Sequence, residues 1–232
     1  MSYSKDTQQV FDDWAQNGRA EGMERGHKTR ALQALDQIPL VAGDRLLDLG
    51  CGNGWATRWL LAAAGEGAQA TGIDVADAML DRARSQSTGL AGIRFASAAF
   101  DDLPWPDASF DHAFSMEALY YAPDLAAALR SIARVLRPGG TLTSCIDFFE
   151  ENPYSAGWPA MLDVEMKRLS ESGWCAAFEQ AGLVVDACFR CYDPRPADPS
   201  DGAQEQRETL DFRQNIGSLA IRGRVPGAVG RM

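Results

Sequence analysis

Residues 46–55, which read LLDLGCGNGW, constrain the fold of this chain more than any other segment. The apolar run contains an acidic residue, Asp48, and three alternate glycines follow it before an alanine- and leucine-rich stretch begins. Glycine adopts backbone conformations that other residues rarely adopt, and it lets a ligand lie directly against the main chain. The pattern predicts a buried strand, a sharp turn and a helix, with a ligand bound at the turn.

Short apolar runs alternate with helical patterns from this point to residue 148. The runs typical of strands are 45–49, 70–75, 93–96, 110–116 and 141–148. The stretches typical of helices are 55–64, 77–84 and 125–136, with Asp77 as an expected N-cap and Pro138 beyond the last helix. This alternation indicates crossover connections and a mostly parallel sheet covered on both faces, which is the α/β, doubly wound class.

The last third of the chain follows a different pattern. A helix is expected over 169–181, and strands are expected over 183–192 and 218–225 with no helix between them. The proline-rich segment 193–200 is typical of a surface loop. Two strands joined without a crossover helix should pair antiparallel, so we expect a seven-stranded sheet with an antiparallel last strand.

The N-terminal segment predicts a helical cover. Residues 4–17 place Phe11 and Trp14 on one face of a short amphipathic helix. Glycines at positions 18, 22 and 26 argue against a stable helix through the next segment, and a second helix is expected over 27–38. We expect this glycine-punctuated segment to order when a ligand binds.

Charge and composition narrow the class of partner. Asp and Glu number 32 against 22 Lys and Arg, which gives a formal net charge of -10. Binding to nucleic-acid phosphates or to anionic lipid needs a positive surface, so we expect no nucleic acid and no membrane partner. The longest strictly apolar stretch, 59–64, is too short to span a bilayer, and the polar N-terminus has no signal-peptide core. These features predict a cytoplasmic protein.

Cysteine and histidine usage indicates no metal site. The five cysteines are scattered and odd in number, which is typical of reduced thiols. Cys188 and Cys191 form a C-x-x-C pair, but this spacing puts them on opposite faces of a strand. His112 falls within the expected fourth strand and is interpreted as structural, so the two histidines supply no ligand pair.

The second expected strand ends close to Asp74, 24 positions after Gly50. Ligands bind at the carboxyl edge of such sheets, so Asp74 should lie beside the glycine turn, where a carboxylate can accept hydrogen bonds from ribose hydroxyls. A dinucleotide-binding turn has the pattern G-x-G-x-x-G, whereas this chain has G-x-G-x-G and places Trp55 where that pattern has glycine.

The D-x-G-x-G-x-G spacing that starts at Asp48 resembles motif I of the class I S-adenosylmethionine-dependent methyltransferases, and Asp74 matches their ribose-binding acid. Residues 101–111 (DDLPWPDASFD) resemble the family's D-L-P-F-x-D-x-S-F-D segment, and residues 136–140 (LRPGG) match its L-R-P-G-G turn. The motifs occur in the family's order, within residues 40–192. The resemblance, strongest to the small-molecule branch, implies a Rossmann-like sheet, S-adenosyl-L-methionine as cofactor and a small-molecule methyl acceptor.

The resemblance also implies a role for each matching residue. Asp48 should hold the methionine ammonium of the cofactor, and Asp74 its ribose hydroxyls. The other residues implied at the cofactor are Gly50, Cys51, Gly52, Val75, Met79, Ala99, Phe100 and Met116. Ala99 departs from the family pattern, because many relatives have an acidic residue there to contact the adenine. Either the backbone amide of Phe100 or the carboxylate of Asp101 is expected to make that contact.

The cofactor carries an activated methyl group, so in-line transfer mainly requires an acceptor held about 3 Å away in the right alignment. A general base matters only where the acceptor loses a proton. The candidate bases are His27, which we prefer, Glu117, Tyr120, Tyr121 and Asp147. An aromatic wall is implied at the acceptor, where it would hold an apolar ring or a cationic amine. Its residues are Tyr120, Tyr121, Phe148, Phe149, Tyr154 and Trp158, and ordinary packing of a lid is the alternative.

We expect a single domain over 1–232, with a cover over 1–39, a cofactor-binding half over 40–150 and a substrate-side half over 151–232. The expected function is methyl transfer to a small molecule, with catalysis mainly by positioning. A non-catalytic S-adenosylmethionine-binding protein and an NAD-dependent oxidoreductase on the same architecture are the alternatives. The sequence leaves the acceptor atom and the oligomeric state open.

Overall fold

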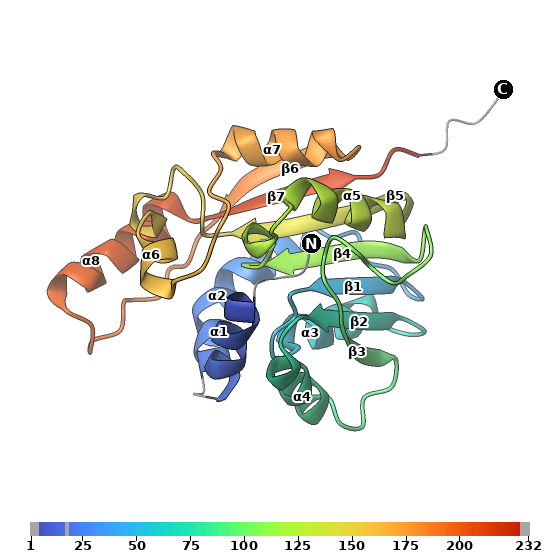
Figure 1. The fold of residues 1–232 in the computed structure, drawn as a ribbon, viewed down its shortest axis with the longest axis horizontal. Helices are drawn as coiled ribbons and strands as arrows, with labels where there is room; N and C mark the ends of the chain where they lie inside the picture. The colour runs from blue at the N-terminus through green and yellow to red at the C-terminus, as the bar shows by residue number, and fades with distance from the viewer. Residues whose placement is uncertain (1–4, 17–18, 228–232) are drawn as a thin grey trace.

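A seven-stranded sheet organises the computed structural model, which describes residues 5–16 and 19–227 (Figure 1). The strands are β1 (Arg45–Leu49), β2 (Gln69–Asp74), β3 (Ile93–Ser97), β4 (Phe110–Met116), β5 (Leu136–Ile146), β6 (Val184–Cys191) and β7 (Ser218–Arg224). Their order across the sheet is β3-β2-β1-β4-β5-β7-β6, and β7 runs antiparallel to both of its neighbours. The predicted seven strands and the antiparallel last strand are confirmed.

Helices cover both faces of the sheet. They are α1 (Lys5–Gln16), α2 (Arg19–Leu35), α3 (Trp55–Ala64), α4 (Asp77–Gln86), α5 (Leu125–Val135), α6 (Trp158–Leu162), α7 (Glu171–Gln180) and α8 (Ala203–Asp211). Short turns of helix are η1 (Leu119–Tyr121), η2 (Pro153–Ser155) and η3 (Phe212–Ile216). None of these described helices is long and apolar enough to cross a membrane.

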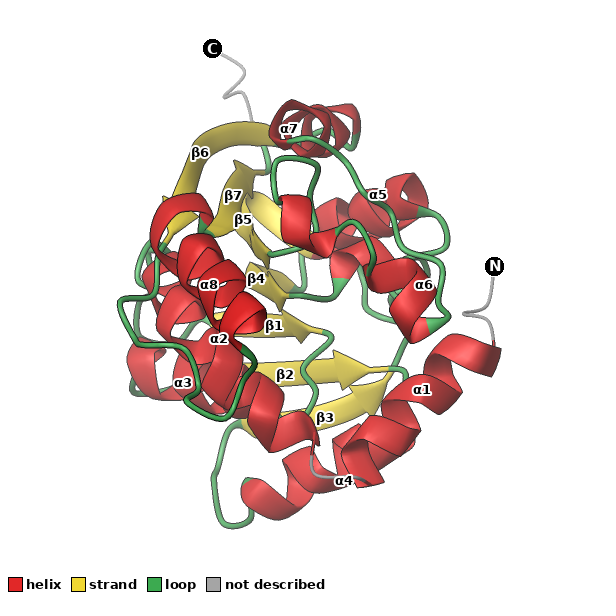
Figure 2. Cartoon of the chain, turned by 90° about the vertical axis from the view of Figure 1, so that its left-hand side faces the viewer, coloured by secondary structure: helices red, strands yellow, loops and turns green. Residues whose placement is uncertain are grey.

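Alternate residues of each buried strand serve two separate cores. On β1, Leu46 packs with buried residues of α2 and α3, whereas Leu47 and Leu49 pack with those of α5 and α7. This two-residue alternation follows from strand geometry, and burial on both faces explains why Leu46, Leu47 and Leu49 are all apolar. Strands β1 to β5 are parallel, so their carboxyl ends all lie at one edge of the sheet. In Figure 2, α1 and α6 lie on one side of this edge and α2 and α8 on the other.

Helix α2 contradicts the expectation of a broken N-terminal segment. It runs from Arg19 to Leu35 and includes Gly22 and Gly26, while Gly18 lies outside the described residues. Helical stability in proteins comes mainly from packing, which overrides the propensity of single glycines. Here Ala31, Ala34 and Leu35 are completely buried against the sheet.

The connection between β6 and β7 is also more structured than expected. Helix α8 and the turn η3 lie between the two strands, although the strands still pair antiparallel. Segment 203–211 (AQEQRETLD) is polar and buries no residue, so hydrophobic periodicity did not reveal it.

Two smaller expectations need adjusting. Strand β5 starts at Leu136, before the Pro-Gly-Gly turn, because Leu136 pairs with Phe110. Helix α4 begins at Asp77 with Ala76 as its N-cap residue, and the Asp74 carboxylate accepts the hydrogen bond from the Ala76 amide. Asp77 therefore supports the helix start as a first-turn acid rather than as its cap.

The two glycines inside α2 provide a stability test. A Cβ at Gly26 would meet no atom within 4 Å, and one at Gly22 would come no closer than 4.0 Å to Arg25. The double variant Gly22→Ala/Gly26→Ala should raise the free energy of unfolding by about 1–2 kcal/mol, because alanine loses less conformational entropy in a helix. Thermal unfolding should show a midpoint roughly 2–8 °C higher. An unchanged or lower midpoint would show that α2 is not helical through these positions.

Candidate active site

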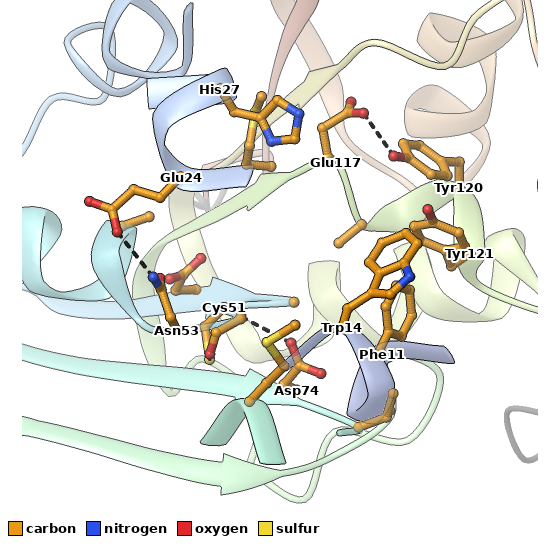
Figure 3. A pocket seen from close by; sticks show the side chains of 18 of the residues that line it. Phe11, Trp14, Glu24, His27, Cys51, Asn53, Asp74, Glu117, Tyr120 and Tyr121 are labelled. Atoms are coloured by element: carbon orange, nitrogen blue, oxygen red, sulfur yellow. Dashed lines mark hydrogen bonds between the residues drawn. The ribbon is translucent and has the colours of Figure 1, made fainter. Parts of the chain in front are cut away.

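A cavity of about 300 Å³ opens at the carboxyl edge of the sheet (Figure 3). It extends from the glycine loop after β1 and the end of β2 to the ends of β4 and helix α6. Helices α1 and α2 contribute side chains from the N-terminal cover. The sequence order reverses in this sheet between β1 and β4, and open α/β sheets bind ligands at such a switch point.

The glycine loop is held to the neighbouring strand by its backbone. The amides of Gly50 and Cys51 both donate to the carbonyl of Ile73, at 2.9 and 2.8 Å. Gly50 has φ of 72°, and a Cβ there would lie 2.3 Å from the Ala118 Cβ. Gly52 has φ of 50°, and a Cβ there would meet nothing within 4 Å. The loop therefore packs tightly on one side and leaves its backbone open at Gly52, which lines the cavity.

Two buried carboxyls lie beside this loop. Asp48 accepts a hydrogen bond from the Thr57 hydroxyl at 2.5 Å, so α3 fixes its orientation. Asp74 accepts backbone hydrogen bonds from Gly52 and Ala76, both at 3.0 Å. Burial raises the pKa of Asp48 to about 7, with the charge of Asp74 adding to the effect of burial and the Thr57 hydrogen bond opposing it. Burial also raises the pKa of Asp74.

A second polar cluster occupies the opposite end of the cavity (Figure 3). The Tyr120 hydroxyl donates to Glu117 Oε2 at 2.8 Å, and the Asp147 amide donates to Glu117 Oε1. His27 Nε2 lies 4.0 Å from Asp147 Oδ2. Glu117 has φ of 53°, a left-handed conformation that is uncommon for residues other than glycine and occurs often at functional sites.

The sheet register brings this cluster together. Met116 at the end of β4 pairs with Cys145 near the end of β5, so Glu117 and Asp147 follow neighbouring strands at the same edge. Because β7 is antiparallel, its first residue lies at that edge too, and the Ser218 hydroxyl donates to Asp147 Oδ1.

Arg30 of α2 neutralises the acids behind this cluster. Its guanidinium lies 2.7 Å from Asp147 Oδ2 and 3.6 Å from Asp193 Oδ2, and it also donates to the Ser218 hydroxyl at 2.6 Å. The Arg30 side chain is only 4% exposed. A buried ion pair with several charge-assisted hydrogen bonds fixes both partners, since removing either would leave a buried charge unpaired.

Burial shifts the pKa values of the side chains in this cluster in the direction that favours their uncharged forms. It lowers the pKa of His27, since the nearby Asp147 charge opposes the shift only in part and the Arg30 charge adds to it. Burial, together with the charge of Asp147, raises the pKa of Glu117 well above its usual value. The pKa of Tyr120 is raised by burial and by the charge of Glu117. At neutral pH the cluster therefore presents an uncharged imidazole and an uncharged phenol.

The donor atoms of His27, Glu117 and Asp147 lie within 4.8 Å of one another, close enough to surround a metal ion. Both Glu117 oxygens already accept hydrogen bonds, and Arg30 and Ser218 engage both Asp147 oxygens. The arrangement thus already satisfies the carboxylates with protein groups, and we assign no metal to it.

Most site residues predicted from the sequence line this cavity. Those at the cofactor end are Asp48, Gly50, Cys51, Gly52, Asp74, Val75, Met79, Phe100 and Met116, and the three predicted catalytic residues are His27, Glu117 and Tyr120. Ala99 does not line it, so its cofactor contact stays a prediction. Asp101 lines a separate depression with Arg130 and Ser131.

The predicted aromatic wall is only partly present. Tyr120, Tyr121 and Trp158 line the cavity, and Phe148 packs behind them, with ring centroids 5.4 Å from Tyr120 and 6.0 Å from Trp158. Phe149 instead lies under the Arg190 guanidinium, and the Tyr154 hydroxyl donates to Asp211 at 2.6 Å. His112 is buried and bound to Thr141, which confirms its structural interpretation.

Several lining residues were not predicted as site residues. They include Phe11, Trp14, Glu24, Asn53, Met161 and Leu162. The three-residue spacing of Phe11 and Trp14 showed an apolar face without showing what it covers. Glu24 of α2 accepts a hydrogen bond from the Asn53 side chain at 3.0 Å, which links the cover to the glycine loop.

Comparisons with known proteins agree with this geometry. The family model described as "Methyltransferase domain" matches residues 47–144. The chain is 37% identical to a chain in the solved complex between the Haloferax volcanii Trm112 methyltransferase activator and a proposed methyltransferase. That match has a TM-score of 0.85 and covers 93% of this chain and 97% of the other. The chain belongs to the class I S-adenosylmethionine-dependent methyltransferases.

The alignments with curated relatives of this methyltransferase cover a smaller part of the chain. It is 37% identical over 139 residues to the 27-O-demethylrifamycin SV methyltransferase of Amycolatopsis mediterranei, covering 59% of this chain and 48% of the relative. It is 40% identical over 120 residues to the malonyl-[acyl-carrier protein] O-methyltransferase of Halorhodospira halophila, covering 52% and 40%. The methyltransferase thus spans about half the length of the curated relatives it matches.

The cofactor end of the methyltransferase fits S-adenosylmethionine chemically. Asp48 and Asp74 offer buried carboxyls to an ammonium and to ribose hydroxyls, and the open backbone at Gly52 leaves room for a ligand. Burial raises the pKa of the Cys51 thiol well above its usual value, so this residue contributes its backbone rather than a thiolate.

Substitutions at Gly50 and Gly52 test separately how the loop packs and how it contacts a ligand. Gly50→Ala should lower the free energy of unfolding by about 2–5 kcal/mol, because a left-handed conformation and overlap with Ala118 both cost energy. Gly52→Ala should cost only about 1–2 kcal/mol but weaken S-adenosylhomocysteine binding, because the new methyl group occupies the open backbone surface. Urea unfolding and calorimetric titration measure the two effects. Equal loss of stability in both variants would contradict the close approach at Gly50.

The Asp48 carboxyl predicts how cofactor affinity depends on pH. Its pKa of about 7 means that a proton must leave when a cofactor ammonium binds below that pH. S-adenosylhomocysteine affinity should therefore fall by up to about tenfold per pH unit below 7 and level off above it. The groups that face Asp48 are Asp74, Cys51 and Arg58, and Asp74 also has a raised pKa. Calorimetry between pH 5.5 and 7.5 measures the slope.

The matched variant is Asp48→Asn, which keeps an acceptor for Thr57 and removes the titrating group. It should bind S-adenosylhomocysteine more weakly at pH 7.5 and show a shallower slope. A slope equal to that of the wild type would assign the pH dependence to another group.

Proposed function

We propose that this methyltransferase transfers the methyl group of S-adenosylmethionine to an oxygen atom of a small-molecule acceptor. The observation that carries the proposal is one continuous cavity with a glycine loop and two buried carboxyls at one end and His27, Glu117 and Tyr120 at the other. Several relatives named as O-methyltransferases support oxygen as the acceptor atom.

The cofactor end holds and orients its ligand. Asp48 binds the ammonium of the methionine portion, and Asp74 accepts hydrogen bonds from the ribose hydroxyls. Val75, Met79 and Phe100 provide apolar contact for the adenine. When bound, S-adenosylmethionine supplies a methyl group already activated on a sulfonium. The chain's own contribution is therefore position, exclusion of water and management of one proton.

His27 is the base in this proposal. Its imidazole is uncharged at neutral pH because burial lowers its pKa, so it can accept the hydroxyl proton of the acceptor. The positive imidazolium that results lies 4.0 Å from the Asp147 carboxylate, which Arg30 and Ser218 hold in place. General-base help of this kind contributes about 10²- to 10⁴-fold to a rate.

Glu117 and Tyr120 orient the acceptor oxygen. Their hydrogen bond of 2.8 Å fixes the phenol against the carboxyl, and the Asp147 amide fixes the carboxyl from the other side. Two linked hydrogen-bonding groups at the cavity wall give a hydroxyl a defined direction.

Formation of S-adenosylhomocysteine from S-adenosylmethionine with a panel of small phenols and alcohols tests the proposal. His27→Asn should lower kcat by about 10²- to 10⁴-fold and leave S-adenosylhomocysteine affinity within about threefold. Tyr120→Phe should lower kcat by roughly tenfold, which corresponds to one lost hydrogen bond.

Tyr154→Phe is the matched control for Tyr120→Phe. Both hydroxyls donate to a carboxylate, but Tyr154 does so to Asp211 away from the cavity, so its removal should leave kcat unchanged. Stabilisation by NAD and not by S-adenosylhomocysteine would overturn the proposed cofactor. Unchanged turnover in His27→Asn would show that His27 is not the base.

A further inference from the structure

We propose that the acceptor is an electrically neutral, largely apolar molecule with a hydroxyl on a ring, and that the cavity rejects anionic acceptors. This inference rests on the proposed function, since it concerns the same cavity. It follows from the charges and surfaces that line the acceptor end and from where the neighbouring cations are held.

The ionisable residues of the cavity carry no permanent positive charge. Among the described residues that line it there is no lysine or arginine. The acids and the histidine that line it are Glu24, His27, Asp48, Asp74 and Glu117. An anionic acceptor would therefore lose its hydration without gaining a cationic side chain as a partner.

Two cations close to the cavity are already paired with other groups. Arg30 is buried between Asp147 and Asp193, at 2.7 and 3.6 Å. Lys28 lies 3.3 Å from Glu24 and stacks over the Trp55 ring at 5.8 Å. Turning Arg30 towards an acceptor would leave the buried Asp147 carboxylate without its arginine partner, which costs several kcal/mol. These pairs keep both cations from serving an anionic acceptor.

The polar groups that remain offer hydrogen bonds without charge. Burial lowers the pKa of His27 and raises the pKa values of Glu117 and Tyr120, so each shift favours the uncharged form of its group. A hydroxyl can both donate to and accept from such groups. A cationic acceptor is also disfavoured, because the bound cofactor brings a positive sulfonium to the same cavity.

The remaining wall of the acceptor end is apolar and comes from two helices at the mouth. Phe11 and Trp14 project from α1, and Trp158, Met161 and Leu162 project from α6. Figure 2 shows α1 and α6 on the same side of the sheet edge. Phe11 also packs edge-on against Tyr121 at 4.9 Å. Aromatic edges and faces of this kind contact a ring better than a flexible polar chain.

Three probes of similar shape separate the possibilities. Naphthol, naphthoate and naphthylmethylammonium present a neutral hydroxyl, an anion and a cation on the same ring system. Their affinities are measured by calorimetry on the full chain with saturating S-adenosylhomocysteine, so no turnover is needed. Naphthol should bind at least tenfold more tightly than naphthoate. Because S-adenosylhomocysteine lacks the sulfonium charge, naphthylmethylammonium reports only on the lining side chains and serves as the charged-ring reference.

A charge added at the mouth provides a matched pair of variants. Met161 lines the cavity and is 68% exposed, so its replacement leaves the core intact. Met161→Lys should strengthen naphthoate binding by about threefold to tenfold, because it supplies the missing cation. Met161→Gln, of similar length and uncharged, should not. S-adenosylhomocysteine affinity confirms that both variants are folded.

The outcomes distinguish failure of the proposed function from failure of the inference about the acceptor. If S-adenosylhomocysteine does not bind the wild-type chain, the proposed function fails. If it binds and naphthoate binds as tightly as naphthol, the inference about the acceptor is overturned. Binding of S-adenosylhomocysteine with no binding of naphthol overturns it as well.

Discussion

The buried guanidinium of Arg30 is the contact on which the site depends. It joins α2 to β5 through Asp147, to β7 through Ser218 and to the segment after β6 through Asp193. Arg195 adds to this junction, because it pairs with Asp193 and donates to the carbonyl of Arg25 in α2. Arg30 thus fixes the position of helix α2 at the carboxyl edge of the sheet.

This junction also pairs the positive and negative charges that lie behind the cavity wall. Burial alone would raise the pKa of Asp193, but hydrogen bonds from Arg195 outweigh it and keep the carboxyl ionised. The positive charges near the sheet edge are consequently balanced by buried acids behind the cavity wall. The cavity itself keeps an uncharged acceptor end beside an acidic cofactor end, which is the arrangement a cationic cofactor and a neutral acceptor require.

Local motifs explain why the cofactor end was predictable and the acceptor end was only partly so. Residues 48–54 form one turn, and Asp74 follows the next strand, so their proximity follows from parallel sheet geometry. Arg30 and Ser218 are separated by 188 positions, and no pattern in either segment indicates their contact. Polar helix α8 lacked hydrophobic periodicity, and α2 stays helical through two glycines because its other face is buried. These features arise from tertiary packing.

The buried acids at the cofactor end lower the folding stability when they are ionised, and a bound cation can offset this loss. Asp48 has a pKa of about 7 in the folded chain against an ordinary value of 3.8, so the folded state binds the more protons between these values. Its contribution to stability is therefore lost as pH rises from about 4 to 7, by up to about 4 kcal/mol once it is ionised. In the proposed function, a cofactor ammonium offsets that cost by pairing with the carboxylate. The methyltransferase thus stores at Asp48 an unfavourable charge that only a cationic ligand relieves, which favours the cofactor over neutral adenosine compounds.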